Sequence, residues 1–184
     1  PTNEAYAVAK IAGVKLCEAY KQQYGFNAIS IMPTNLYGPG DNFDLETSHV
    51  VPALIRKAHE AKVRRLERLS VWGTGTPLRE FLHVDDLAHA CIFLMDVYSS
   101  LTPINVGCGE DISIQDLAMT VADVVGFKGE LEYDHRRPDG TPKKVLNVSR
   151  LFNLGWKPRI KLRDGLAETY NWYCENHDAL QRIN

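Results

Sequence analysis

The strongest constraint on the fold is an alternation between two kinds of apolar pattern along the chain. Segments with an apolar residue every three or four positions, as in an amphipathic helix, are separated by short apolar runs that are typical of buried parallel strands. Parallel strands need a long crossover connection, which a helix usually supplies, so the alternation predicts an α/β fold. The runs that predict strands are residues 27–32, 69–72, 80–84, 104–106 and 130–133.

Helices are expected where a capping residue precedes the helical period and a stop signal such as glycine follows it. Asp85 and Asp86 are expected to cap one helix, and Ser113 to open a capping box for the next. Residues 33–44 and 136–144 are expected to be loops because they are rich in Pro, Gly and polar residues. The expected helices cover residues 3–24, 47–61, 85–98, 113–125 and 150–154, and a last one carries Leu166, Tyr170 and Tyr173.

The first expected helix begins with Asn3 and Glu4, which are typical of helix starts. Its apolar stripe includes Val8, Ile11 and Leu16 and has the spacing of a helix that packs against a core. We therefore expect this stripe to be buried.

Composition excludes several classes of function. The 184 residues suffice for one domain or slightly more, and a net charge of −2 gives no electrostatic reason to expect nucleic acid or an anionic membrane as partner. No run approaches the ~18 apolar residues of a membrane span, and the first residues lack the pattern of a secretory signal. The 4 cysteines are widely spaced, without a metal-binding or redox pair, which favours a reducing, cytoplasmic location and predicts no metal site.

Tyr6 and Lys10 are the first candidates for chemistry. They are four residues apart on an expected helix, which places them on one face. A neighbouring ammonium favours the ionised form of a phenol, whose pKa is ordinarily about 10, so the pair can exchange a proton with a carbonyl or an alcohol near neutral pH. A tyrosine and a lysine at this spacing also occur by chance in a substantial fraction of chains of this composition. The spacing alone is therefore weak evidence and is compatible with an ordinary surface pair.

The order of several longer motifs resembles that of a known enzyme family. YAVAK, PTNLYGP, WGTGTPLREFLHVDDLA and INVGCGEDISI follow one another as in the extended short-chain dehydrogenases/reductases that modify nucleotide sugars. Within this family, DNFD, SHVVPALIRK and RPDGTPKK are most similar to members that epimerise a GDP-4-keto-6-deoxymannose at C3 and C5 and then reduce C4 with NADPH. The resemblance covers nearly the whole chain.

The resemblance implies the fold and the domain organisation. The chain would be the C-terminal part of a Rossmann-like parallel sheet plus a small α/β substrate-binding domain. Residues 1–42 would complete the dinucleotide-binding domain, and residues 43–184 would be mainly the substrate-binding domain, with strands at about 80–106 returning to the sheet. None of the G-x-G sites completes G-x-G-x-x-G, so the pyrophosphate site is expected before Pro1, and the chain alone is expected to be inactive.

The resemblance also implies roles for individual residues. Tyr6 would donate a proton in ketone reduction, Lys10 would hold the nicotinamide ribose, and His49 would be an acid in the epimerisation. The residues implied to contact NADP(H) are Lys10, Pro33, Thr34, Asn35, Leu36 and His49. Those implied to contact the GDP-sugar are Lys57, Trp72, Arg79 and Asp139. The second epimerisation residue, a Cys, would precede Pro1.

Alternatives stay open at this point. A nucleotide-sugar 4-epimerase or 4,6-dehydratase would share Tyr6 and Lys10 but would not need His49 as an acid. A non-catalytic nucleotide-sugar-binding module is the alternative from a different class. Taken alone, Trp72 is as typical of a core anchor at a strand end, and the Pro-Asp-Gly at Asp139 is typical of an ordinary turn. The family resemblance implies a homodimer for the full-length protein.

Overall fold

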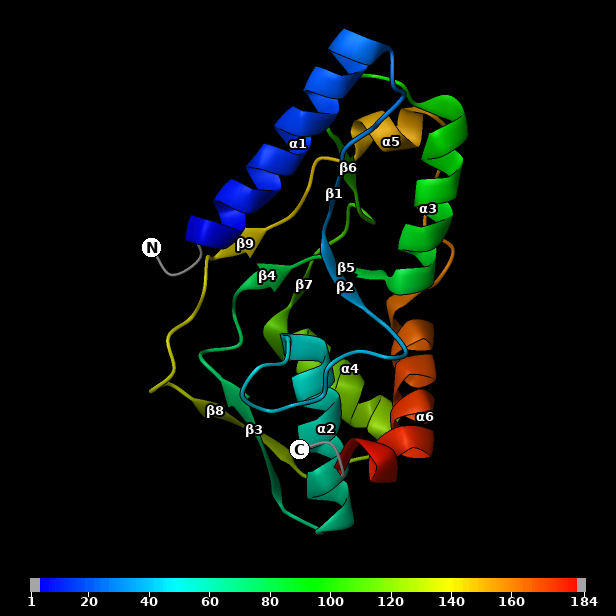
Figure 1. Cartoon of the computed structure of the whole chain (residues 1–184). Coiled ribbons are helices and arrows are strands. Elements are labelled where there is room, and N and C mark those ends of the chain that lie inside the picture. The colour runs from blue at the N-terminus through cyan, green and yellow to red at the C-terminus, as the bar shows by residue number, and fades with distance from the viewer. Residues whose placement is uncertain (1–3, 182–184) are drawn as a thin grey trace.

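The computed structural model describes the backbone of residues 4–181 and the side chains of residues 4–176. It has the α/β architecture that the alternation predicts, with parallel strand pairs connected through helices. Figure 1 shows the arrangement. The elements are α1 (Glu4–Tyr24), β1 (Ile31–Pro33), β2 (Asn35–Tyr37), α2 (Val50–Val63), β3 (Arg68–Trp72), β4 (Leu78–Arg79), β5 (Phe81–His83), α3 (Val84–Val97), β6 (Ile104–Val106), β7 (Ile112–Ser113), α4 (Ile114–Val125), β8 (Glu130–Asp134), β9 (Lys143–Lys144), α5 (Ser149–Asn153) and α6 (Leu162–Gln181).

The parallel pairs join segments that are far apart in sequence. β1 pairs with β6, β2 with β5, and β3 with β8, all in parallel. β4 lies between β7, which is antiparallel to it, and β9, which is parallel. Only Thr34 separates β1 from β2. Their partners β6 and β5 therefore lie beside one continuous stretch of chain.

Two apolar clusters hold the molecule together. In the lower part of Figure 1, α2, α4 and α6 pack with β3 around Ile55, Leu117 and Leu166, each of which is fully buried. In the upper part, α3 and α5 pack with β5 and β6 around Leu94 and Trp156.

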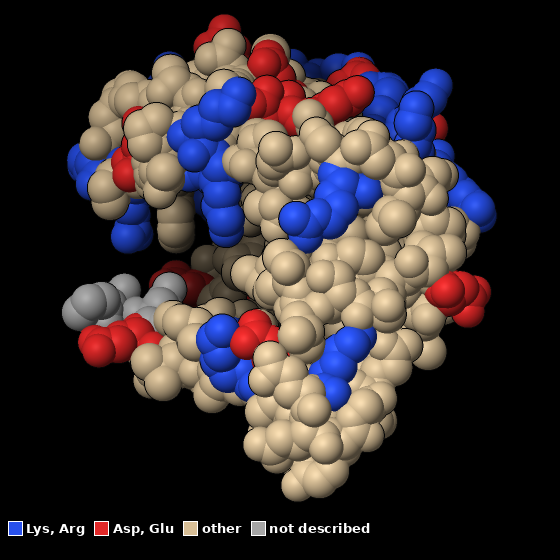
Figure 2. Space-filling view, turned by 90° about the horizontal axis from the view of Figure 1, so that it is seen from above, with Lys and Arg blue, Asp and Glu red and all other residues tan. Residues whose placement is uncertain are grey.

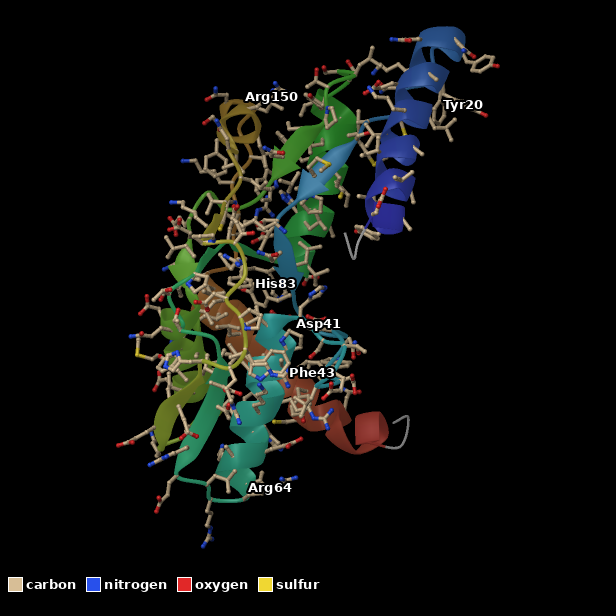
Figure 3. All side chains as sticks on the ribbon, turned by 90° about the vertical axis from the view of Figure 1, so that its left-hand side faces the viewer. Tyr20, Asp41, Phe43, Arg64, His83 and Arg150 are labelled. Atoms are coloured by element: carbon tan, nitrogen blue, oxygen red, sulfur yellow. The ribbon has the colours of Figure 1, made fainter. Side chains whose placement is uncertain are left out.

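Helix α1 forms as expected, but its apolar stripe is not buried. Val8, Ile11 and Leu16 are each about 60% exposed, and no described residue of α1 is buried. A helix buries a face only against another element, and no other element of the described residues 4–181 covers this stripe. Figure 3 shows Tyr20 on the part of α1 that stands away from the rest of the molecule. Asn3, the expected first residue of this helix, lies outside the described residues.

Local signals predicted some element ends and missed others. The capping box is confirmed, since Ser113 Oγ accepts a hydrogen bond from Asp116 N at 3.0 Å. Asp85 and Asp86 do not cap α3: His83 is its N-cap, and its Nδ1 accepts from Asp85 N at 3.3 Å. Asp86 is buried and instead accepts hydrogen bonds from the backbone N–H groups of Arg159 and Ile160.

The two expected loops each contain a strand. Residues 33–44 include β2, and residues 136–144 include β9. Both strands form because a distant strand offers backbone partners, β5 for β2 and β4 for β9. The helix expected from residue 47 begins at Val50, after three more residues of loop.

Among the residues that the structure describes, no helix is long and apolar enough to cross a membrane. The same part of the chain holds no group of three or more His, Cys, Asp or Glu side chains that could bind a metal ion.

Candidate active site

Most of the predicted site residues line one cleft of about 730 Å³. Its wall is built from α1, the β1–β2 stretch, the start of α2, the end of β3, β4 and the loop between β8 and β9. Figure 2 shows a hollowed face of the molecule with Lys and Arg side chains beside the hollow. The predicted residues in the wall are Tyr6, Pro33, Thr34, Asn35, Leu36, His49, Trp72, Arg79 and Asp139. Lys10 and Lys57 are not part of the wall but contact the rings of Tyr6 and Trp72.

Helix α1 presents the Tyr6–Lys10 pair at one end of the cleft. The Tyr6 side chain is 67% exposed, and Lys10 Nζ lies 5.5 Å from the centre of its ring. The i, i+4 spacing therefore does place the two groups together on one helix face, and Tyr6 reaches the cleft wall. A phenol with a nearby ammonium is suited to donate or accept a proton.

The β1–β2 stretch is fixed in place by the backbone of Glu80. Thr34 Oγ1 and Asn35 Nδ2 both donate to the Glu80 carbonyl oxygen, at 3.2 and 2.8 Å. These two side chains are thus bound to the protein, which leaves the strand's backbone and its remaining surface to form the wall of the cleft.

Sequence reasoning missed the Glu80 side chain, which is fully buried. Its Oε1 accepts from Gly109 N at 2.7 Å and its Oε2 accepts from Leu146 N at 2.9 Å. A Cβ atom on Gly107 would lie 2.2 Å from Oε1, so only glycine fits beside this carboxylate. The signal in the sequence is a charged residue at the first position of the expected buried strand 80–84.

His49 stands at the N-terminal end of α2 and faces the cleft. It is the N-cap residue by position, with an extended backbone, but its side chain makes no capping hydrogen bond. The imidazole therefore does not cap the helix. This finding contrasts with His83, whose ring nitrogen does cap α3.

Asp41 is a second acidic residue in the cleft that the sequence analysis did not identify. Burial raises its pKa, and the hydrogen bond from Asn42 N and the charge of His49 lower it. Asp41 and His49 thus interact electrostatically inside the same cavity. Figure 3 shows Asp41 in the middle of the molecule, near Phe43.

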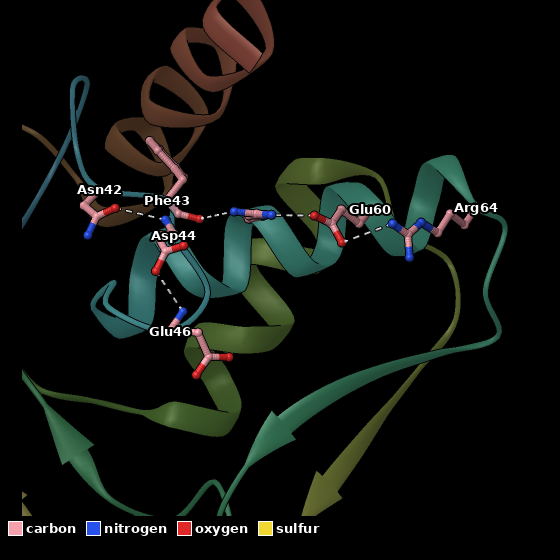
Figure 4. Close-up of polar contacts among 7 residues, drawn as sticks. Asn42, Phe43, Asp44, Glu46, Glu60 and Arg64 are labelled. Atoms are coloured by element: carbon pink, nitrogen blue, oxygen red, sulfur yellow. Dashed lines mark hydrogen bonds and ion pairs between the residues drawn. The ribbon is translucent and has the colours of Figure 1, made fainter. Parts of the chain in front are cut away.

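The loop before His49 is tied to α2 by a set of polar contacts (Figure 4). Arg56 Nη1 donates to the Phe43 carbonyl oxygen at 3.0 Å, and Arg56 Nε donates to Glu60 Oε1 at 2.9 Å. Asn42 Oδ1 accepts from Asp44 N, and Asp44 Oδ1 in turn accepts from Glu46 N at 3.1 Å. These contacts hold the loop on α2 and so position Asp41 and His49 at the cleft.

At the other end of the cleft, Trp72 is 47% exposed, which contradicts its interpretation as a core anchor. Lys57 Nζ lies 4.6 Å from the ring centre, and Arg137 Cζ lies at the same distance. Burial lowers the pKa of Lys57, the charge of Arg137 lowers it further, and Asp134 acts in the opposite direction. Arg137 is a further residue at this end that the sequence analysis did not identify.

Asp139 is held by the turn that follows β3. Its carboxylate accepts from Thr74 N at 2.9 Å and from Thr74 Oγ1 at 2.7 Å, and these bonds lower its pKa. Gly73 has a φ of +78°, and a Cβ there would lie 2.1 Å from Asp139 Oδ1. The Pro-Asp-Gly segment is therefore more than an isolated turn, because it forms the cleft wall and is bound to a distant loop.

The cysteines lie outside this cleft wall. Cys108 Sγ donates to the carbonyl oxygens of Phe81 and Glu110, both at 3.4 Å, and burial raises the pKa of its thiol. A thiol with a raised pKa is a poor nucleophile or base at neutral pH.

Residues 1–107 match the NAD dependent epimerase/dehydratase family. The chain is 60% identical over 176 residues to GDP-L-fucose synthase 1 of Arabidopsis thaliana, covering 96% of this chain and 54% of that protein. It is 54% identical over 190 residues to GDP-L-fucose synthase of Escherichia coli, covering 98% of this chain and 59% of that protein. The chain spans about half the length of the curated relatives that it matches.

Solved structures confirm the fold. A GDP-L-fucose synthetase from Naegleria fowleri bound to NADP superimposes with a TM-score of 0.89 at 32% identity, covering 96% of this chain and 57% of that one. A GDP-6-OMe-4-keto-L-xylo-heptose reductase from Campylobacter jejuni gives a TM-score of 0.83 at 37% identity, covering 95% of this chain and 61% of that one. With more than half of its residues matched by the family model, the chain belongs to the NAD dependent epimerase/dehydratase family.

Proposed function

We propose that the full-length protein containing this chain is a GDP-L-fucose synthase, which converts GDP-4-keto-6-deoxy-D-mannose to GDP-L-fucose. The observation that carries the proposal is the meeting of Tyr6, His49 and Trp72 in the wall of one cleft. A phenol paired with a lysine is suited to reduction, an imidazole to epimerisation, and an exposed indole to binding a nucleotide. The names of relatives at 54–60% identity support the same activity.

The cleft fits the nicotinamide end of NADP(H). Tyr6 and residues 33–36 line the same cleft, so the Tyr6 hydroxyl and the β1–β2 stretch would face the same ligand. Lys10, Pro33, Thr34, Asn35 and Leu36 would hold this end of the cofactor, together with His49. When bound, NADPH supplies a hydride for C4 of the sugar. The motif that receives a dinucleotide pyrophosphate is not found in this chain.

The residues of the chain would divide the proton transfers between them. Tyr6 would donate its hydroxyl proton to the C4 oxygen as the ketone becomes an alcohol, and the charge of Lys10 would stabilise the phenolate that is left. Epimerisation at C3 and C5 removes a proton beside the carbonyl and returns one on the opposite face. His49 would return that proton, since an imidazole is the side chain that most often serves as an acid or base in catalysis.

The nucleotide would occupy the other end of the cleft. Trp72 would stack on the base or ribose, and Arg79 and Lys57 would bind oxygens of the diphosphate. Asp139 would accept hydrogen bonds from the substrate with the lone pairs that Thr74 leaves unused. A cytoplasmic location and a homodimer belong to the same proposal; the exposed apolar side chains of α1 support association with another protein surface.

His49→Gln in the full-length protein is expected to slow epimerisation about 100-fold or more, because one proton-transfer group is lost. The measurement is incorporation of deuterium at C3 and C5 of GDP-4-keto-6-deoxy-D-mannose in D₂O without NADPH, followed by NMR. Glu46→Gln is the matched control, since Glu46 lies on the same loop with its side chain outside the cleft wall. Deuterium exchange that is unchanged in His49→Gln would remove His49 from the mechanism. Conversion of UDP-glucose instead of the GDP-sugar would contradict the proposed function itself.

A further inference from the structure

Two cationic side chains from distant segments converge on Trp72. Lys57 comes from α2, and Arg137 comes from the loop between β8 and β9. Lys57 Nζ and Arg137 Cζ each lie 4.6 Å from the centre of the indole ring. The ring attracts each of them through its negatively charged face, which favours cations within about 6 Å.

The charge of this pair is not neutralised by the protein. Among residues 4–176, no carboxylate lies within ion-pair distance of Lys57 or Arg137. Asp134, the acidic group that favours charged Lys57, is bound by Arg136, with Nε at 2.8 Å and Nη2 at 3.2 Å. Asp139 is bound by Thr74. The repulsion between the two cations is one cause of the lowered pKa of Lys57.

Neither Lys57 nor Arg137 belongs to the cleft wall, but both contact Trp72, which does. Trp72 belongs to that wall, and so do Pro138, Asp139 and Gly140, which directly follow Arg137. Arg79, another member of the wall, reaches the same loop, since its Nη2 would lie 2.8 Å from a Cβ on Gly140. Three cations therefore surround one end of a cavity, and an anion is the ligand that this arrangement favours.

We propose that Arg137 is a further substrate-binding residue, whose guanidinium, in contact with the Trp72 ring, binds the diphosphate of the nucleotide together with Lys57. The inference rests on the proposed function and deepens it by assigning a contact to the charged part of the substrate. A lysine ammonium acts as a point charge, whereas a guanidinium offers two parallel N–H groups that match two phosphate oxygens. The contact with the Trp72 ring holds the guanidinium at this position before the ligand arrives.

Arg136 provides a matched control on the same loop. It is adjacent in sequence and carries the same charge, but its side chain is 90% exposed and bound to Asp134. A general effect of positive charge would appear equally in variants of both arginines. A specific contact would appear only in variants of Arg137.

The experiment is calorimetric titration of the full-length wild-type, Arg137→Gln, Arg137→Lys and Arg136→Gln proteins with guanosine, GMP and GDP. Arg137→Gln is expected to weaken GDP binding about 10- to 100-fold, the range for losing hydrogen bonds to a charged group. Guanosine binding is expected to stay unchanged, because guanosine has no phosphate. Arg137→Lys is expected to give an intermediate loss, and Arg136→Gln a change of less than about 3-fold, as for an exposed ion pair.

The pH dependence of GDP binding supplies a second readout. Charged Lys57 binds the diphosphate, so affinity is expected to fall as the pH rises through the lowered pKa of Lys57. Removing the Arg137 charge favours the charged form of Lys57, so in Arg137→Gln this fall is expected to move to higher pH. A fall that stays at the same pH in Arg137→Gln would show that the two charges do not act together on the ligand, and would contradict the inference.

The outcomes separate the two proposals. If the wild-type protein binds GDP and Arg137→Gln binds it with the same affinity, this inference is overturned and the proposed function stands. An equal loss of guanosine and GDP affinity would also overturn it. The substitution would then affect binding of the base or folding of the protein, and not binding of the diphosphate. Wild-type protein that binds no GDP would overturn the proposed function and the inference together.

Discussion

Replacing Tyr6 by Phe in the full-length protein is expected to lower kcat for reduction about 10²- to 10⁴-fold, the usual contribution of one proton-transfer group. The substitution removes only the hydroxyl from a side chain that is 67% exposed, so the fold should be unaffected. GDP affinity should also be unchanged, because Trp72 and the cations form the opposite end of the cleft. The measurement is consumption of NADPH with GDP-4-keto-6-deoxy-D-mannose, together with calorimetric titration with GDP.

Tyr20→Phe is the control for this prediction. Tyr20 lies on the same helix and is also exposed, and its ring contacts Tyr24 at 5.4 Å between ring centres, away from the cleft. Its replacement should leave kcat within about 2-fold of the wild-type value, as expected for a surface change. Deuterium exchange at C3 and C5 should persist in Tyr6→Phe and be lost in His49→Gln. Equal losses of reduction in the two tyrosine variants would contradict the assigned role of Tyr6.

Replacing Glu80 by Ala is expected to lower the free energy of unfolding by about 3–5 kcal/mol, the range for breaking a buried charged interaction. The variant leaves the backbone N–H groups of Gly109 and Leu146 buried without their acceptor, and it opens a cavity beside Gly107. Urea unfolding of the full-length protein, monitored by circular dichroism, provides the measurement. Activity should fall as well, because the backbone of Glu80 holds Thr34 and Asn35 at the cleft.

Glu132→Ala is the matched control for the stability prediction. Glu132 lies in β8 and makes a 2.9 Å ion pair with Arg68, but both side chains are more than half exposed. Such a surface pair contributes only about 0–1 kcal/mol. A loss of stability of similar size in both variants would show that Glu80 does not act through its buried hydrogen bonds.

Elements with strong local signals agree with the sequence-based expectation. The helix from Ile114 to Val125 was predicted with its ends, because Ser113, Asp116 and Gly126 satisfy its terminal groups within a few residues. The strand at β2 was missed, since Asn35–Tyr37 reads as loop and becomes a strand only by pairing with β5. The role of Asp86 could not be predicted for the same reason, because its hydrogen-bond partners Arg159 and Ile160 lie just before α6, far along the chain.

The cleft could be predicted in part. The spacing of Tyr6 and Lys10 and the family motifs identified residues that the structure places in one wall or against it. Asp41, Glu80 and Arg137 also lie within family motifs, but their contacts could not be predicted, because each acts through a partner from another segment.

The pattern of residues along the chain thus established the α/β architecture, most helices and the spacing of the Tyr6–Lys10 pair. These features depend on hydrogen bonds and side-chain neighbours within a few positions of one another. The exposure of α1, the buried role of Glu80 and the convergence of Lys57 and Arg137 on Trp72 emerged only in three dimensions. Burial and electrostatic interaction depend on distances in space, and the parallel strand pairing brings together segments that local patterns treat separately.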